Sequence, residues 1–562
     1  MKRLSIVVAL FSISFISQTL SAQDAPKGWH LLDQIDDHYY GISLGKAYRF
    51  VIEHNKQSKP VIVAVLDSGV DTAHEDLKAI LWRNPKEIPG NGIDDDGNGY
   101  IDDIHGWNFL GGKDGQNLKK NSDERSRVYH RFKSQFLGKA IDTTTISYEE
   151  KYHYTLWKKA AAEMNFSEEE QTELMYVEIT AKAIKRHDKI LRKELGQEEY
   201  TVETLEKFEP NSRAGKEAKL GYLTCMKILG IEREETNIST IEQLDEYIDG
   251  KKSAYESKDK EPIDYRAETI KDNYFDINDN HYGNNDVMGP NSMHGTHVTG
   301  IIAAKRNNGI GMDGVADNVQ VMMVRVVPDG DEYDKDVALG IFYAVNNGAK
   351  VINMSFGKSF SPEKAWVDSA LRYAASKDVL IIHASGNDGI DNDDKENYPS
   401  SYSEKSKTTI ENFMNIGASS DPKISGTLAA DFSNYGKQSV DVFAPGVKIY
   451  STLPGKNKYG NLKGTSMSAP IVTGLAAMIR SYYPDLSAIQ VRKIIENSVV
   501  KPDSTIANIK PGPQPTAVPF ASLSKTGGIV NAYYAVSEAE LTKPLMLKEA
   551  TKGNSKTPKS KN

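Results

Sequence analysis

The sequence predicts an α/β fold: a doubly wound, mostly parallel sheet flanked by helices, with an inserted all-α subdomain. Two observations predict the sheet. Short apolar runs of buried-strand length recur along the chain, and helix-like stretches lie between several of these runs. The third observation is a charge-rich, glycine-poor segment in the middle of the chain. With 562 residues, 39% of them hydrophobic, the chain can form a large core and is too apolar for a disordered protein.

The N-terminus has the three parts of a secretory signal peptide. Met1–Arg3 carries positive charge, residues 4–16 are apolar, and Ser21 and Ala22 offer a small-residue cleavage site that leaves Gln23 first. The alternative is a membrane anchor, but the apolar run is short for a span. We therefore expect residues 1–22 to be removed on export to the periplasm, the cell surface or the medium, with no stable membrane span afterwards.

Six apolar runs are candidate strands: 61–66, 319–327, 349–354, 379–384, 414–418 and 440–443. Residues 336–347 and 362–376 have helical character and separate three of them. In such sheets ligands meet the carboxyl ends of the strands, so the residues that end each strand are the candidates for function.

Residues 120–270 read as an inserted helical subdomain. They hold only six of the 43 glycines and are rich in charge. Apolar residues recur at helical spacing, at Leu174, Val177, Ala181, Ile184, Leu191 and Leu195. We expect the charges to form a solvated face. The remaining chain then divides into a catalytic domain in two parts, 23–119 and 271–543, and a Lys-rich disordered tail, 544–562.

Three segments supply the groups of a nucleophilic hydrolase. Asp67 ends the first strand, His294 precedes a small-residue helix at 298–304, and Ser466 precedes a helix at 471–482 that has Pro470 in its first turn. A serine hydroxyl needs an imidazole to remove its proton, and the imidazole needs a carboxylate to fix its tautomer. Two histidines three residues apart could instead bind metal, but the glutamate of a zinc-hydrolase helix is missing.

The same segments carry a family resemblance. VIVAVLDSGVDTAHEDL, HGTHVTGIIAA and GTSMSAPIVTGLAA resemble, in this order, the three active-site signatures of the subtilisin-like (subtilase) serine peptidases. The resemblance implies catalytic roles for Asp67, His294 and Ser466 and unstructured polypeptides as substrates. It also implies that Asn387, which is otherwise an ordinary turn residue, donates to the oxyanion together with the Ser466 N–H.

Substrate contacts are implied in the same way. The segment 351–357 resembles the edge segment that pairs with an extended substrate, and 382–387 resembles the strand end before the oxyanion residue. The substrate-binding residues that this predicts are Ser355, Phe356, Gly357, Ala384, Ser385 and Gly386. Because both ends of the helical segment flank active-site motifs, we expect it to cap the substrate cleft or to restrain activity.

An acidic loop predicts structural calcium. Residues 94–99 match the first half of an EF-hand-type loop, although His105 stands where the closing glutamate is expected. The predicted ligands are Asp94, Asp96, Asn98, the carbonyl of Tyr100, and Asp102 or Asp103. The alternative is a turn without an ion. Cys225 is the only cysteine, so the chain has no intramolecular disulfide. An exported protein without disulfides needs another stabilising element, and this favours a bound metal.

A second calcium site follows from the resemblance alone. Asp76 and Asn308 match the strong calcium site of the family, but Arg306 falls where a carbonyl ligand is expected. Both residues could equally belong to turns.

The predicted function is therefore an exported serine endopeptidase that hydrolyses peptide bonds through an acyl-enzyme on Ser466. The alternatives are a transpeptidase that uses the same triad and a noncatalytic calcium-dependent binding protein. The formal net charge of −8 gives no support for nucleic-acid binding.

Overall fold

The computed structural model describes residues 25–544 except 165–167, 232, 234–235 and 404. The predicted signal peptide, 1–22, lies outside the described residues, as does the predicted tail from residue 545 onward. Within the described part of the chain, no helix combines the length and the apolar character needed to cross a bilayer.

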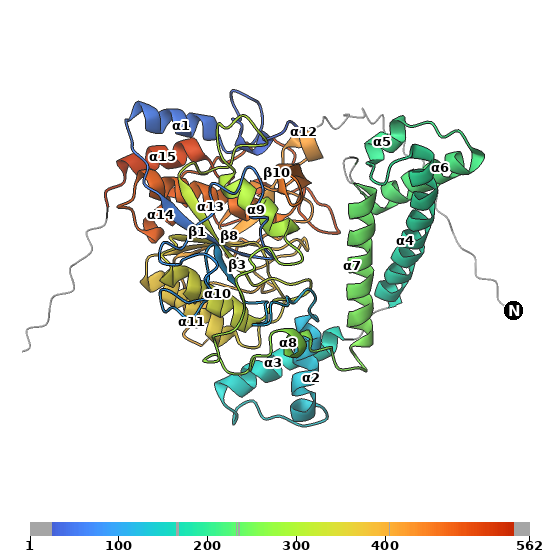
Figure 1. Cartoon of the computed structure of the whole chain (residues 1–562), viewed down its shortest axis with the longest axis horizontal. Coiled ribbons are helices and arrows are strands. Elements are labelled where there is room, and N and C mark those ends of the chain that lie inside the picture. Colours follow the sequence, from blue (N-terminus) through green and yellow to red (C-terminus); the bar gives the residue numbers. More distant parts are fainter. Residues whose placement is uncertain (1–24, 165–167, 232, 234–235, 404, 545–562) are drawn as a thin grey trace, which may run out of the picture.

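A seven-stranded sheet lies at the centre of the larger body in Figure 1, and all of its neighbouring strands run parallel. In spatial order its strands are β2 (Gly106–Asn108), β3 (Val319–Arg325), β1 (Val61–Asp67), β4 (Val351–Met354), β5 (Leu380–Ala384), β8 (Phe413–Ser419) and β9 (Val442–Pro445). This confirms the predicted α/β class, and each of the six predicted apolar runs contains or overlaps a strand. Sequence reasoning missed β2, because three residues are too few to show a pattern.

Two layers of helices cover the sheet, and alternate strand residues face each layer. On one face Val63 and Val65 of β1 join a core with α1 (Leu44–Glu53), α9 (Met293–Ala303), α13 (Thr465–Tyr482), α14 (Ala488–Asn497) and α15 (Ala532–Leu541). On the other face Ala64 and Leu66 pack with α10 (Asp334–Asn346) and α11 (Lys364–Ser376). The two layers lie on opposite sides of the sheet in Figure 1.

Smaller elements complete this body. They are the antiparallel hairpins β10 (Ile449–Leu453) with β11 (Lys458–Leu462) and β6 (Tyr402–Ser403) with β7 (Thr408–Thr409), the short helix α12 (Pro422–Ser425), and the 3-10 turns Trp29–Leu31 and Phe520–Ser522. The β10–β11 hairpin ends three residues before α13 begins, so it leads directly into the Ser466 segment.

Residues 120–270 contain two groups of helices. The first group packs on the main body, because α2 (Glu124–Phe136) and α3 (Tyr148–Glu163) share a core with Phe360 from the loop after β4. The short helix α8 (Tyr265–Thr269) lies beside them (Figure 1).

The second group is a bundle that stands to one side of the main body in Figure 1. It consists of α4 (Glu168–Leu195), α5 (Val202–Lys207), α6 (Arg213–Leu229) and α7 (Asn237–Glu256). Its core is drawn from within this group and includes Ile184, Leu205 and Tyr222. The two ends of the bundle meet, since Ser257 Oγ lies 4.0 Å from Met164 Sδ. At the far end, Glu199 lies 4.0 Å from Lys458 of β11.

Candidate active site

Three elements bring the predicted triad residues to the carboxyl edge of the sheet. Asp67 is the last residue of β1, an interior strand of the sheet. His294 is the second residue of α9, and Ser466 is the second residue of α13. The first residues predicted for these two helices, 298 and 471, are too late in the chain. The first begins at Met293, so His294 lies within its first turn, and the second begins at Thr465, so Pro470 lies inside it.

The carboxylate of Asp67 orients His294. Asp67 is 1% exposed, and its Oδ1 lies 2.8 Å from His294 Nδ1 while also accepting the N–H of Ser68 at 2.7 Å. A carboxylate only accepts hydrogen bonds, so the proton of the neutral imidazole sits on Nδ1 and Nε2 remains an acceptor. The His294 side chain is 35% exposed, so the ring is not sealed within the core.

The electrostatics of His294 suit a base. Burial alone would lower its pKa, but the charge of Asp67 and the hydrogen bond from Nδ1 outweigh that effect and raise the pKa above its ordinary value. The opposite happens at His297, three residues on, where burial lowers the pKa to about 3 and keeps the ring neutral. The two histidines of the motif therefore differ in role: only His294 contacts a carboxylate.

Ser466 is clamped to the segment that follows β4. Its hydroxyl donates to the carbonyl of Ser355 at 3.0 Å, rather than to His294, in this conformation. In return Ser355 Oγ donates to the carbonyl of Ser466 at 3.0 Å. That carbonyl needs an outside donor because Pro470, four residues later, has no N–H. The proline inside α13 is thus accommodated by a side chain of the active-site segment.

Two N–H donors converge on the space above Gly464. Asn387 Oδ1 accepts from Thr465 N at 2.8 Å and from Thr465 Oγ1 at 3.0 Å, which fixes the amide and leaves Nδ2 to donate elsewhere. A Cβ placed on Gly464 would lie 3.5 Å from Asn387 Nδ2 and 3.6 Å from Ser466 N. Gly464 has φ 145°, where only glycine is unstrained, so this space stays open.

The predicted substrate segments differ in what they can offer. The sequence placed 351–357 at an edge, but β4 lies between β1 and β5, so its ladder is occupied on both sides. Only Ser355, Phe356 and Gly357, which extend past the last residue of β4, lie beyond that ladder. Val351 is therefore a core residue, whereas the predicted substrate-binding residues Ser355, Phe356 and Gly357 lie past the end of the strand. Their contact with a substrate stays a prediction.

The second predicted segment is mostly committed to the core. Ala384 is 3% exposed and Ser385 is fully buried, with Ser385 Oγ donating to the carbonyl of Asn434 at 3.1 Å. The N–H of Ser385 donates to the carbonyl of Ile416, and the N–H of Gly386 donates to Thr465 Oγ1. These backbone donors already have protein partners, and the side chains of Ala384 and Ser385 are almost fully buried. That these residues contact a substrate stays a prediction.

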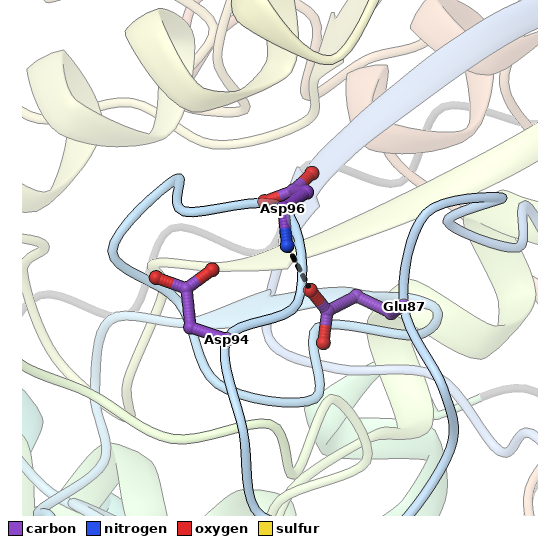
Figure 2. Close-up of side chains that lie close together, drawn as sticks. All are labelled: Glu87, Asp94 and Asp96. Atoms are coloured by element: carbon purple, nitrogen blue, oxygen red, sulfur yellow. Dashed lines mark hydrogen bonds between the residues drawn. The ribbon is translucent and has the colours of Figure 1, made fainter.

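The acidic loop gathers three carboxylates, one of which the sequence did not predict. Oxygen atoms of Glu87, Asp94 and Asp96 lie within 4.8 Å of one another. Figure 2 shows the three side chains close together. Glu87 Oε1 also accepts the backbone N–H groups of Asp95 and Asp96, at 3.0 and 3.2 Å. Glu87 lies seven residues before Asp94, outside any short ligand spacing, so no local pattern marks it.

The other predicted ligands of this loop have different partners. Asp102 accepts the backbone N–H groups of Gly90, Asn91 and Gly92, at 2.7, 3.3 and 2.8 Å. Asp103 is buried, where desolvation raises its pKa to about 6, and it accepts from Asn84, Asn98 and the hydroxyl of Tyr343. Asn98 Oδ1 accepts the N–H of Tyr100 at 2.8 Å. The side-chain oxygens of Asp102, Asp103 and Asn98 thus accept hydrogen bonds that stabilise the conformation of the loop.

The second predicted site is a hydrogen-bonded cluster. Asp76 is buried and accepts from Asn308 Nδ2, from the N–H of Met312 and from the hydroxyl of Tyr459. Arg306 turns away from it, because its guanidinium donates to the carbonyl of Gly314 at 2.6 Å and lies over the ring of Tyr48.

A parallel α/β sheet with Asp, His and Ser at its carboxyl edge has the architecture of a serine hydrolase. The family model described as "Subtilase family" matches residues 58–513, and the chain belongs to this family. It is a subtilisin-like serine protease and hence a hydrolase that acts on peptides.

Similar proteins cover parts of the chain. "Subtilisin BL" of Lederbergia lenta is 39% identical over 213 residues, 38% of this chain and 72% of the relative. "Thermophilic serine proteinase" of Bacillus sp. (strain AK1) is 38% identical over 239 residues, 42% of this chain and 53% of the relative. A solved protease of Pseudoalteromonas arctica PAMC 21717 is 29% identical, with a TM-score of 0.37 over 46% of this chain and 78% of its own.

Proposed function

We propose that the chain is an exported serine endopeptidase that forms an acyl-enzyme on Ser466. The observation that carries the proposal is the Asp67–His294 hydrogen bond at the edge of the sheet where α13 presents Ser466. A protonated Nδ1 leaves Nε2 as the base that the nucleophile requires.

The residues then divide the reaction between them. The Ser466 hydroxyl leaves its partner Ser355, gives its proton to His294 Nε2, and Oγ attacks the carbonyl carbon of the peptide bond. Asn387 Nδ2 and the Ser466 N–H donate to the oxyanion that forms. His294 passes its proton to the departing amine as the C–N bond breaks. Water, deprotonated by the same ring, then hydrolyses the ester and restores Ser466.

The proposed substrates are unstructured polypeptides. Ser355, Phe356 and Gly357 lie past the end of β4, so an extended peptide can lie along their backbone without displacing a strand. A folded segment, whose main-chain groups are already paired, cannot make these contacts.

A fluorophosphonate probe tests this proposal directly, because it reacts only with an activated serine. We expect stoichiometric labelling of the purified protein at Ser466, located by mass spectrometry, and none in Ser466→Ala. The matched control is Ser468→Ala, two residues further along α13. Ser468 Oγ donates to the carbonyl of Ala444, so Ser468 should not react in the wild-type protein, and the Ser468→Ala variant should still be labelled at Ser466. An unlabelled wild-type protein would contradict the proposal. Product masses from reduced casein would separate hydrolysis from transpeptidation, since only the latter adds an amine component.

Export is proposed from the N-terminal pattern alone. We expect N-terminal sequencing of the protein recovered outside the cytosol to begin at Gln23. A mature chain that retained Met1, or that stayed bound to the membrane after expression, would contradict cleavage. That the helices of 120–270 cap the cleft stays a prediction.

We also propose that a calcium ion binds Glu87, Asp94 and Asp96. Carboxylate oxygens within 4.8 Å of one another fit one ion with Ca–O distances of about 2.3–2.6 Å. Three acidic groups at this separation repel each other unless a cation lies between them. The ion would stabilise the loop that precedes β2 and would take no part in the reaction.

Thermal unfolding with and without calcium tests this site. A ligand at 100 times its Kd stabilises the folded state by about 2.7 kcal/mol, so we expect calcium to raise the Tm of the wild-type protein by several degrees after EGTA treatment. In Glu87→Gln the calcium-dependent shift should largely disappear. The comparison uses the shift rather than the Tm itself, because Glu87 also accepts backbone N–H groups. Exposed Glu149→Gln is the control and should respond like wild type. An equal shift in Glu87→Gln would overturn the assignment.

A further inference from the structure

A buried ion cluster joins α2 to the segment beside Ser466. Lys358 directly follows Ser355–Gly357, and its side chain is 2% exposed. Its ammonium lies 2.7 Å from Glu124 Oε2 and 2.9 Å from Asp334 Oδ1, and it donates to the carbonyl of Glu332 at 2.6 Å. All three donor positions of the ammonium are therefore used.

Glu124, the first residue of α2, is the partner that comes from the helical segment. Its side chain is 3% exposed and accepts from the guanidinium of Arg127 at 3.1 and 2.7 Å. Its N–H donates to the carboxylate of Asp331 at 2.6 Å. Burial would raise the pKa of Glu124, but the charges of Arg127 and Lys358 outweigh it and lower the pKa to about 2, so the group is ionised at neutral pH.

The segment 355–357 is thus held at both ends. At one end, Ser355 and Ser466 exchange hydrogen bonds. At the other end, Lys358 pairs through its backbone with Tyr398, at 3.0 and 2.9 Å, and through its side chain with Glu124. Buried ion clusters add little net stability compared with apolar packing, because desolvation offsets the Coulomb attraction. Their hydrogen bonds do, however, define one geometry.

We propose that Glu124 is a positioning residue that acts through Lys358 to keep Ser355–Gly357 in the extended form that binds the substrate main chain. The inference rests on the proposed function of that segment. Glu124 touches neither the substrate nor the reacting atoms, so its effect should fall on the binding of extended peptides and not on the chemistry at Ser466.

The experiment compares an extended peptide with p-nitrophenyl acetate, which acylates Ser466 without reaching along 355–357. In Glu124→Gln we expect KM for the peptide to rise about tenfold, the equivalent of one or two weakened hydrogen bonds. The kcat for the peptide and the rate with the ester should stay within about twofold of wild type. Glu149→Gln, which removes an exposed charge from α3, is the matched control and should change neither.

A second variant separates positioning from stability. Glu124→Gln leaves Lys358 with one carboxylate fewer and lowers the Tm, whereas Glu124→Gln/Lys358→Met removes opposite charges together. Asp334 then loses the ammonium but keeps the hydroxyl of Ser361 and the N–H of Glu363 as donors, so this double variant should recover part of the Tm. If the role is positioning, KM for the peptide stays raised in this double variant. If KM returns with the Tm, or if ester and peptide rates fall equally, Glu124 is merely structural and the proposal is overturned. A wild-type protein that fluorophosphonate leaves unlabelled would overturn the proposed function as well.

Discussion

Replacing Asp67 by Asn is expected to lower kcat for peptide hydrolysis about 10⁴-fold while the protein stays folded. The side chain keeps its size, but an amide can present its NH₂ group to His294 Nδ1. Nδ1 must then accept, the imidazole proton moves to Nε2, and this nitrogen can no longer act as the base that the proposed mechanism requires. Initial rates with a fluorogenic peptide, with active sites counted beforehand, measure this effect.

The pH profile adds a second signature. Asp67 raises the pKa of His294, and the ring is a base only when neutral, so kcat/KM rises as the pH passes upward through this pKa. Without the carboxylate the pKa falls, and the acidic limb of the residual activity should move to lower pH. The control is Asp71→Asn, since the Asp71 carboxylate accepts the N–H groups of Ala73 and Gly455 and does not contact His294. A loss in Asp71→Asn as large as in Asp67→Asn would contradict the assigned role.

Replacing Asn387 by Ala is expected to lower kcat by about 10²–10³ with little change in KM. The reason is that Nδ2 donates to an oxyanion that exists only in the transition state, so the ground-state complex loses nothing. Ala also removes the acceptor for the N–H and hydroxyl of Thr465, which could loosen the start of α13.

Asn387→Asp distinguishes the two effects. The carboxylate keeps an oxygen that can accept from Thr465 but has no N–H to offer. If the donor matters, this variant should be as inactive as Asn387→Ala, or worse, because its charge repels the oxyanion. Recovery of activity in Asn387→Asp would instead assign the loss to the anchoring of Thr465.

Local patterns predicted the parts of the fold that depend on local physics. Buried strands such as β1 and β5 show as short apolar runs, and Asp67 is the last residue of β1. The helix starts at Met293 and Thr465 were missed because glycines and small residues there resemble loops. Tertiary contacts stabilise these helix starts. At the start of α13, for example, Ser355 Oγ supplies the hydrogen bond to the Ser466 carbonyl that the helix itself does not provide.

Ion pairs that depend on the tertiary fold could not be predicted. The expectation of a solvated charged face in 120–270 is wrong for Glu124 and Arg266, both buried. Glu124 pairs with Lys358, and Arg266 pairs with Asp272 and Asp336, each within 2.7 Å. A charged residue looks the same in the sequence whether its partner lies four or two hundred residues away, and only the fold reveals which. Glu87 lies only seven residues before Asp94 and was missed because no regular ligand spacing marks it.

The meeting of Met164 and Ser257 bears on how such a chain tolerates change. The chain leaves the main body at Met164 and returns to it at Ser257, and these two residues are in contact. The α4–α7 bundle is therefore connected like a domain that has been inserted into a loop of another domain. Closing a longer or shorter excursion between adjacent ends alters the loop entropy only logarithmically. We therefore expect that a bundle of another length can be accommodated while α2 and its ion cluster stay in place, at the loss of the contact between Glu199 and Lys458. Exchange at this junction offers a route to couple a sensor or a binding module to a protease.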